Sequence, residues 1–209
     1  MESYIQRISI MAVPILLAVT FHEVAHGMVA YRLGDPTAKN AGRLTLNPLA
    51  HLDLVGTLVF LITRMIGWAK PVPVNPLYFK NPRKGMLWVA LAGPATNMVL
   101  AVLSALFLKW LLNLNLPAGS QWNAVLIPVV GMAQTSVYLN VGLAVFNVIP
   151  IPPLDGGRIM VGILPEKQAM SYAKLESFGF ILLLLLIFSG VVQYVVFPII
   201  LAIVSLLLG

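Results

Sequence analysis

Long apolar segments separated by short polar connections make up most of the chain. Four of these segments reach the roughly 20 residues that a membrane-spanning helix needs, and they cover about residues 5–32, 86–112, 122–149 and 177–208. A fifth segment, residues 54–68, is shorter and contains Arg64, so it forms either a tilted short span or a re-entrant segment. The pattern predicts an all-α polytopic membrane protein that forms a single membrane-embedded domain over residues 1–209.

Turn-forming residues modify this pattern in two places. Arg43–Leu46 alternates polar and apolar side chains as a short strand does, so we expect a re-entrant or β-hairpin-like region after the first helix. In the last apolar block, Gly190 and Pro198 predict breaks in the helix. That block therefore forms either one kinked span or one span followed by a partial return.

Composition agrees with a membrane protein. Of 209 residues, 59% are hydrophobic and 10% are charged, and the mean hydropathy is +0.92, whereas soluble domains average about 25% charged residues. The absence of cysteine excludes disulfides and thiolate metal ligands. The N-terminus lacks a clear basic region and a small-residue cleavage site, so the first apolar segment is not expected to be a signal peptide.

The basic residues indicate an orientation in the membrane. If residues 54–68 do not span, 11 of the 13 basic residues lie on one side, and Arg7 and Lys109 lie opposite. If they do span, the split is eight against four, with Arg64 in the bilayer. The positive-inside rule favours the first arrangement, with the N-terminus outside and the large connections in the cytoplasm. The net charge of +6 is explained by these loops, and we expect no nucleic-acid partner.

The first apolar segment contains the sequence His22-Glu23-Val24-Ala25-His26. Histidines four residues apart lie on one face of a helix, the spacing that two ligands of one zinc ion need, and a glutamate beside the first histidine can activate a zinc-bound water. Such groups are costly at membrane depth. The alternative is a pair of buried histidines bonded to backbone carbonyls, which leaves Glu23 without a purpose.

Asp155 is the best candidate for the third protein ligand that a catalytic zinc requires. It lies near the end of the stretch from Asn147 to Gly157, in which three prolines end a helix and two glycines follow Asp155, so the chain can point one carboxylate inward. The competing interpretation is a simple Asp-Gly turn. Asn147 has an amide that either binds a developing oxyanion or substrate backbone, or caps the broken helix.

These motifs resemble those of the site-2 protease family, the intramembrane zinc metalloproteases of peptidase family M50. The similarity rests on HEVAH, on the Asn147–Gly156 stretch and on Gly93-Pro94-Ala95-Thr96-Asn97 between them, and it is closest to compact prokaryotic members without PDZ or CBS domains. The resemblance implies a three-helix catalytic core, one Zn²⁺ held by His22, His26 and Asp155, and Glu23 and Asn147 as catalytic residues. It further implies water access from the cytoplasmic side.

The resulting hypothesis is a zinc-dependent intramembrane endopeptidase of the prokaryotic cytoplasmic membrane. Its substrates would be single-span membrane proteins or signal peptides, cleaved in regulated intramembrane proteolysis or signal-peptide clearance. Two alternatives remain: a zinc or proton transporter, since buried ionisable groups also mark ion pathways, and an inactive scaffold that binds helices.

Three further features each have a structural and a functional interpretation. Gly93 and Asn97 either allow close helix packing or contact substrate. His51 and Asp53 either fix a loop by hydrogen bonds or form a second metal site. The Arg43–Leu46 strand is either a structural edge or a partner for an extended substrate.

Overall fold

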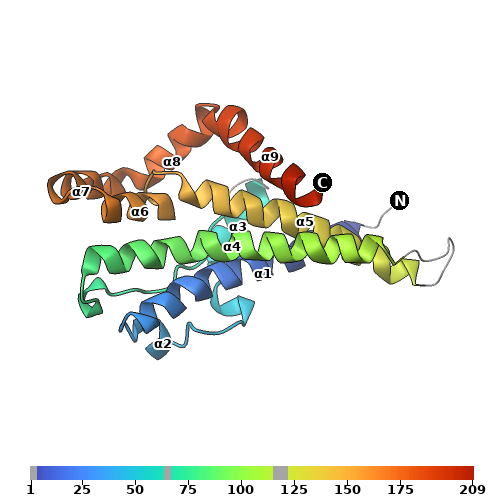
Figure 1. Cartoon of the computed structure of the whole chain (residues 1–209), viewed down its shortest axis with the longest axis horizontal. Coiled ribbons are helices and arrows are strands. Elements are labelled where there is room, and N and C mark those ends of the chain that lie inside the picture. The colour runs from blue at the N-terminus through green and yellow to red at the C-terminus, as the bar shows by residue number, and fades with distance from the viewer. Residues whose placement is uncertain (1–3, 64–66, 115–121) are drawn as a thin grey trace.

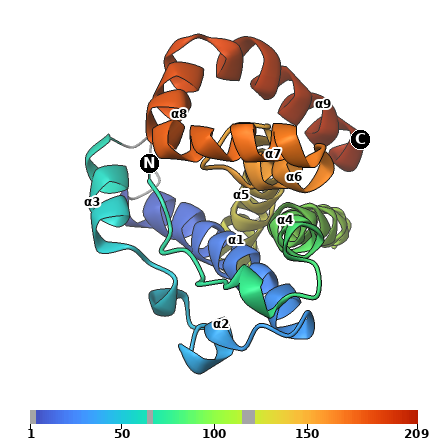
Figure 2. The same cartoon turned by 90° about the vertical axis from the view of Figure 1, so that its left-hand side faces the viewer.

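Three long helices form the centre of the protein. The computed structural model describes residues 4–63, 67–114 and 122–209. Helices α1 (Tyr4–Arg32), α4 (Pro82–Leu112) and α5 (Asn123–Val148) lie side by side, with α4 antiparallel to the other two (Figure 1). The end-on view places α2 (Thr37–Asn40) and α3 (Leu54–Thr63) beside α1, and the C-terminal helices beside α4 and α5 (Figure 2).

Small side chains allow these helices to approach closely. Ala101 and Ala105 of α4 pack against Val137 and Val141 of α5, and Val204 from the C-terminal helix joins this buried cluster. In a bilayer the hydrophobic effect does not draw helices together, so close packing of small residues must do so.

Helix α4 also has a defined start, because the Asn81 side chain accepts a hydrogen bond from the Lys84 N–H at 3.0 Å.

The helices confirm the predicted fold class of a polytopic all-α membrane protein. Within the described residues, four helical stretches are long and apolar enough to cross a membrane: residues 10–32, 82–112, 123–148 and 166–188. The first three lie on the first three predicted segments. Large apolar side chains that are more than half exposed, such as Leu103 and Leu106, are suited to contact with lipid.

The two ends of the short apolar segment lie beside each other. Helix α3 has 10 residues, about 15 Å at 1.5 Å per residue, which is half of the roughly 30 Å hydrocarbon core. Leu52 and Ala69, on either side of α3, form an antiparallel bridge, and the Lys70 N–H donates to the His51 carbonyl at 2.9 Å. The bonded ends are the arrangement that a re-entrant segment would need, and this alternative stays a prediction; Arg64 lies outside the described residues.

The predicted strand at Arg43–Leu46 is wrong. This segment is irregular and follows α2, and the Arg43 N–H donates to the Ala38 carbonyl instead of to another strand. The Arg43 guanidinium is buried and donates to the Lys70 carbonyl at 2.7 Å. The turn therefore satisfies the Arg43 N–H that a strand partner would have used, and among the described residues the β-hairpin-like region is reduced to the Leu52–Ala69 bridge.

The last apolar block folds into two helices that form an arch (Figure 1). After α6 (Asp155–Ile163), α7 (Glu166–Ala173) and a 3-10 turn (Lys174–Phe178), helix α8 (Gly179–Phe188) leads away from the bundle, and α9 (Phe197–Leu208) returns to α5.

Of the two predicted breaks in this block, only one occurs. Gly190 has φ +81° and ends α8, as predicted. The prediction that Pro198 breaks the helix is wrong: Pro198 follows a π-helical turn (Val192–Val196) and lies in the first turn of α9, where a helix tolerates proline.

Asp35 fixes the connection between α1 and α4, so replacing it should destabilise the protein. Its carboxylate is fully buried and accepts from the Thr37 N–H at 2.9 Å, from the Thr37 hydroxyl, and from the Asn75 N–H at 2.7 Å. Asp35→Asn turns an NH2 group toward one of these donors, so we expect a loss of about 1–3 kcal/mol in the free energy of unfolding, measured in detergent. Asp53→Asn is the control, because the only contact its carboxylate makes among the described residues is with the Gly56 N–H at 2.7 Å, which an asparagine can keep.

The contribution of the Asp35 carboxylate to the free energy of unfolding depends on pH. Burial alone would raise the pKa of Asp35, but the hydrogen bonds from Thr37 and Asn75 lower it below the ordinary value of 3.8. A carboxyl group whose pKa is lowered on folding stabilises the protein above its unfolded pKa and loses this effect as the pH falls. The difference in stability between wild type and Asp35→Asn should therefore be full at neutral pH and shrink below about pH 4.

Candidate metal centre

Three ligand-type atoms converge where α1 meets the start of α6. The Nε2 atoms of His22 and His26 are 3.0 Å apart, and Oδ2 of Asp155 lies 3.2 Å from the first and 3.3 Å from the second. Each residue is only 8% exposed. Among the residues that the structure describes, these three form the one group of histidine and carboxylate side chains that could hold a metal ion.

The proline and glycine run after α5 places Asp155 in this triangle. Helix α5 ends at Val148, and Asp155 is the first residue of α6. A Cβ atom on Gly156 would overlap the carbonyl oxygens of Val148 and Ile149, and one on Gly157 would lie 2.8 Å from the Pro152 nitrogen. Glycine at both positions is therefore required for α6 to begin directly against the end of α5.

The other ring nitrogen of each histidine faces a hydrogen-bond acceptor. His22 Nδ1 lies 2.5 Å from Asn97 Oδ1, and His26 Nδ1 lies 2.7 Å from the Val89 carbonyl oxygen, both on α4. An acceptor at Nδ1 requires the proton there, so in the neutral ring the Nε2 atom carries the lone pair. Two Nε2 lone pairs and a carboxylate oxygen therefore face one another.

Gly93 makes room for the two imidazoles. A Cβ atom at this position would lie 2.5 Å from His22 Cε1 and 2.5 Å from His26 Nε2. The close approach predicted from the Gly93–Asn97 spacing is therefore present, and the groups that approach are the imidazoles of α1. Asn97 contacts His22 directly; the sequence motif indicated a packing or substrate-binding residue and did not indicate this contact.

The triangle fits a tetrahedral zinc ion. Zinc–ligand bonds of about 2.0–2.1 Å place neighbouring ligands about 3.3 Å apart, close to the separations of the three atoms. Asp155 Oδ2 is buried and has no hydrogen-bond donor, and a buried anionic oxygen beside two lone pairs is costly unless a cation compensates for it. The geometry and the donor set therefore both suit a divalent metal with nitrogen and oxygen ligands.

Glu23 lies beside this triangle on α1 and is held by the polypeptide backbone. Its Oε2 accepts a hydrogen bond from the Val72 N–H at 2.9 Å. Val72 lies between Pro71 and Pro73 in the irregular segment that follows Lys70, and it is buried close to Gly27. Proline has no N–H, so the Val72 N–H is the single backbone donor of residues 71–73.

Removing this donor should impair a Glu23-dependent reaction. We expect Val72→Pro to lower the turnover number by about 10–100-fold, the effect of losing a hydrogen bond to a charged group worth about 1.5–3 kcal/mol. Zinc content should not change, because Val72 touches none of the three ligand atoms. Val72→Ala keeps the N–H and serves as the control; equal losses in both variants would assign the effect to packing of the valine side chain.

The remaining candidate residues lie in structural environments. Asn147 is half-buried near the end of α5, and its NH2 group donates to the Leu143 carbonyl at 3.0 Å. His51 is fully buried and its Nε2 contacts the Thr45 carbonyl at 2.8 Å, whereas Asp53 caps α3 through the Gly56 N–H. His51 and Asp53 do not come together in a metal-binding group within the described part of the chain.

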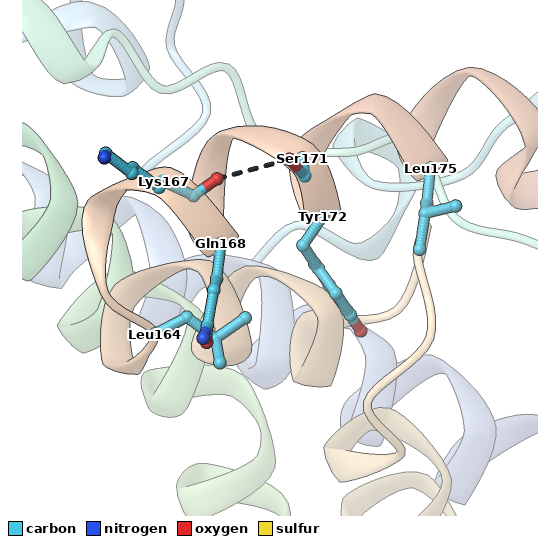
Figure 3. Close-up of a pocket in the computed structure, with 6 residues that line it drawn as sticks. All are labelled: Leu164, Lys167, Gln168, Ser171, Tyr172 and Leu175. Atoms are coloured by element: carbon cyan, nitrogen blue, oxygen red, sulfur yellow. Dashed lines mark hydrogen bonds between the residues drawn. The ribbon is translucent and has the colours of Figure 1, made fainter.

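Two of the larger hollows in the described part of the chain lie outside the triangle. One, of about 550 Å³, is an open depression on α7 lined by Leu164, Lys167, Gln168, Ser171, Tyr172 and Leu175 (Figure 3). The other, of about 660 Å³, is an apolar groove between α4, α5 and the C-terminal arch, with Pro94, Ala95 and Pro150 among its lining residues. The apolar groove is next to the metal-binding region, since Pro94 follows Gly93 on α4.

Comparison with known proteins gives a consistent assignment. The profile of peptidase family M50 matches residues 10–190. The chain is 39% identical to the "Putative zinc metalloprotease YwhC" of Bacillus subtilis, over 90% of this chain and 84% of the relative. It is 32% identical to the "Putative zinc metalloprotease Rip2" of Mycolicibacterium smegmatis, over 83% of this chain and 64% of that protein, so it spans just under two thirds of this second relative. No solved structure gives a significant match.

Proposed function

Because the chain belongs to peptidase family M50, we propose that it is a zinc-dependent endopeptidase of the membrane, with one zinc ion held by His22, His26 and Asp155. The observation that carries this proposal is the buried triangle of Nε2, Nε2 and Oδ2 atoms, 3.0–3.3 Å apart. Its two histidines lie on α1, a helix long and apolar enough to span a bilayer, and Asp155 lies at the start of α6. The printed names of the relatives, which call them zinc metalloproteases, support zinc over other divalent metals.

The roles of the side chains follow from this arrangement. His22, His26 and Asp155 would hold the zinc ion, which when bound would supply Lewis acidity to the scissile carbonyl and lower the pKa of the attacking water to about 7. Glu23 takes the proton of that water on its carboxylate and later returns it to the leaving amine. The Val72 N–H on Oε2 holds the carboxylate in place and leaves its second oxygen for the proton. Asn147 uses one N–H on Leu143, and its other N–H donates to the substrate carbonyl.

The position of the site in an apolar helix supports a substrate that is itself a membrane segment. His22 and His26 lie within residues 10–32 of α1, so the peptide that reaches them is itself a membrane segment, either of a single-span protein or of a signal peptide. Such a helix must unwind locally, because its carbonyl groups are otherwise bonded within the helix. Cleavage of such substrates would serve regulated intramembrane proteolysis or signal-peptide clearance.

The charge distribution supports water access to the proposed zinc site from the cytoplasmic side of a prokaryotic membrane. The connection from α1 to α4 and the segment around α6 and α7 gather at the same end of the bundle (Figure 1), and they carry most of the lysines and arginines of the chain. His26 is the triangle residue nearest to that end of α1. By the positive-inside rule this end faces the cytoplasm, and the whole chain forms one membrane-embedded protease domain.

Metal removal tests the proposed function. Detergent-purified protein should cleave a model single-span substrate, lose all cleavage after treatment with a zinc chelator, and recover it when one equivalent of zinc is returned. The control is a substrate helix stiffened by a run of leucines, which should resist cleavage. Cleavage that survives complete metal removal contradicts a zinc mechanism, and zinc-dependent flux in liposomes without cleavage of any substrate would assign the site to a transporter.

A further inference from the structure

A chain of buried amides connects His22 to the middle of α5. Asn97 on α4 and Asn140 on α5 are 0% and 1% exposed, and both lie in helices long enough to cross a membrane. Asn97 Oδ1 faces His22 Nδ1 at 2.5 Å, and Asn97 Nδ2 donates to Asn140 Oδ1 at 2.8 Å and to the Ala18 carbonyl at 3.3 Å. The orientation of the Asn97 amide is therefore set by the groups that receive its two N–H bonds.

Asn140 is itself held by a third layer of polar groups. Its NH2 group donates to the Ser136 carbonyl at 2.9 Å and to the Ser136 hydroxyl at 3.1 Å, and that hydroxyl lies 2.8 Å from the hydroxyl of Ser104. These contacts leave Asn140 Oδ1 pointing at Asn97. Each amide thus donates from its nitrogen and accepts at its oxygen in a direction that its neighbour determines.

We propose that Asn140 is a positioning residue for zinc binding, which it controls through Asn97 and His22. The inference rests on the proposed zinc site. By accepting a hydrogen bond from Asn97, Asn140 keeps the oxygen of the Asn97 amide, and not its NH2 group, toward His22 Nδ1.

The reverse orientation of Asn97 would disable His22 as a ligand. An NH2 group facing Nδ1 requires a lone pair there, so the ring proton moves to Nε2, and a protonated Nε2 cannot bind a metal. The Ala18 carbonyl contributes a longer contact, 3.3 Å against 2.8 Å, and the dry interior between helices offers no bulk water to replace a missing acceptor. Asn140 therefore contributes more than the Ala18 carbonyl to fixing the orientation of the Asn97 amide.

The first test measures zinc affinity by competition with a chelator, together with the absorption spectrum of the cobalt-substituted protein. Asn140→Leu, which removes the acceptor at similar volume, should bind zinc about 10–100-fold more weakly, the usual effect of losing a group that orients a metal ligand. Its cobalt spectrum should change, because His22 no longer coordinates as in wild type. Val141→Ala is the matched control: it opens space at a fully buried neighbour on the same helix and should leave zinc affinity unchanged.

A second variant separates orientation from simple stability. Asn97→Asp presents an oxygen in either orientation, so His22 no longer depends on Asn140. In this background Asn140→Leu should cost no zinc affinity, whereas a merely structural role of Asn140 would cost the same in both backgrounds. Asn140→Ala, which loses the same acceptor, replaces Asn140→Leu if that variant does not fold.

The outcomes for this inference and for the proposed function are distinct. Wild-type protein that binds no zinc refutes the proposed metal site itself. Wild-type protein that binds zinc, with Asn140→Leu binding it equally well or with losses equal in both backgrounds, leaves the metal site intact and overturns the role of Asn140.

Discussion

Glu23→Gln should abolish cleavage while leaving the protein folded and loaded with zinc. Glutamine has nearly the shape of glutamate and its oxygen can still accept the Val72 hydrogen bond seen at 2.9 Å, but it cannot take a proton from the attacking water. Loss of a positioned general base lowers rates by about 10²–10⁴-fold. The three ligand atoms belong to other residues, so zinc content, measured by metal analysis of the purified protein, should match wild type.

The matched control for this variant is Glu176→Gln. Glu176 is an exposed glutamate whose nearest cationic partner, Arg158, is 3.8 Å away, and such surface contacts contribute little. Its replacement should leave both cleavage and zinc content unchanged. Cleavage by Glu23→Gln at the wild-type rate would remove Glu23 from the mechanism, and loss of zinc from this variant would make it a structural support of the metal site.

The convergence of His22, His26 and Asp155 could be predicted from the sequence because its signals are local. Two histidines four residues apart share a helix face wherever that helix lies, and the run from Asn147 to Gly157 signals a broken helix by its prolines and glycines alone. The groups that orient these side chains through hydrogen bonds could not be predicted in the same way. The Val89 carbonyl, Asn140 and the Val72 N–H act from other segments, and only the packing of those segments against α1 brings them to the site.

The fold likewise has features that could be predicted from the sequence and a feature that could not. The apolar segments were predictable because a bilayer demands a helix of a given length and hydrophobicity, and the break at Gly190 followed from its freedom to adopt a positive φ. The Arg43–Leu46 strand was not a sound prediction, since alternation describes side-chain direction but not which partner satisfies the backbone. There the Arg43 N–H donates to the Ala38 carbonyl in the turn after α2, and it is the Arg43 side chain that donates to the Lys70 carbonyl.

Gly93→Ala should have the second-largest effect, a loss of about 100-fold or more in zinc affinity, at the upper end of what groups around a metal site contribute. The added Cβ would lie 2.5 Å from atoms of both imidazoles, whereas ordinary contacts begin at 3.4 Å. Either the rings or α4 must therefore move by nearly 1 Å, and α4 also carries the acceptors for both Nδ1 atoms, Asn97 and Val89. The ligand triangle and its orienting hydrogen bonds are then disturbed together.

Gly142→Ala provides the comparison that isolates this contact. Gly142 also lies in the middle of a long apolar helix, but a Cβ there would meet only Ile200 Cδ1, at 3.9 Å. Both substitutions raise helix propensity by a similar amount, so a general effect on helix stability would appear in both variants. If zinc binding, measured by chelator competition, falls only in Gly93→Ala, then close approach of α4 to the imidazoles is a requirement of the metal site. Equal affinity in the two variants would mean that the rings can move aside, and that the position of α4 against α1 does not control the ligands.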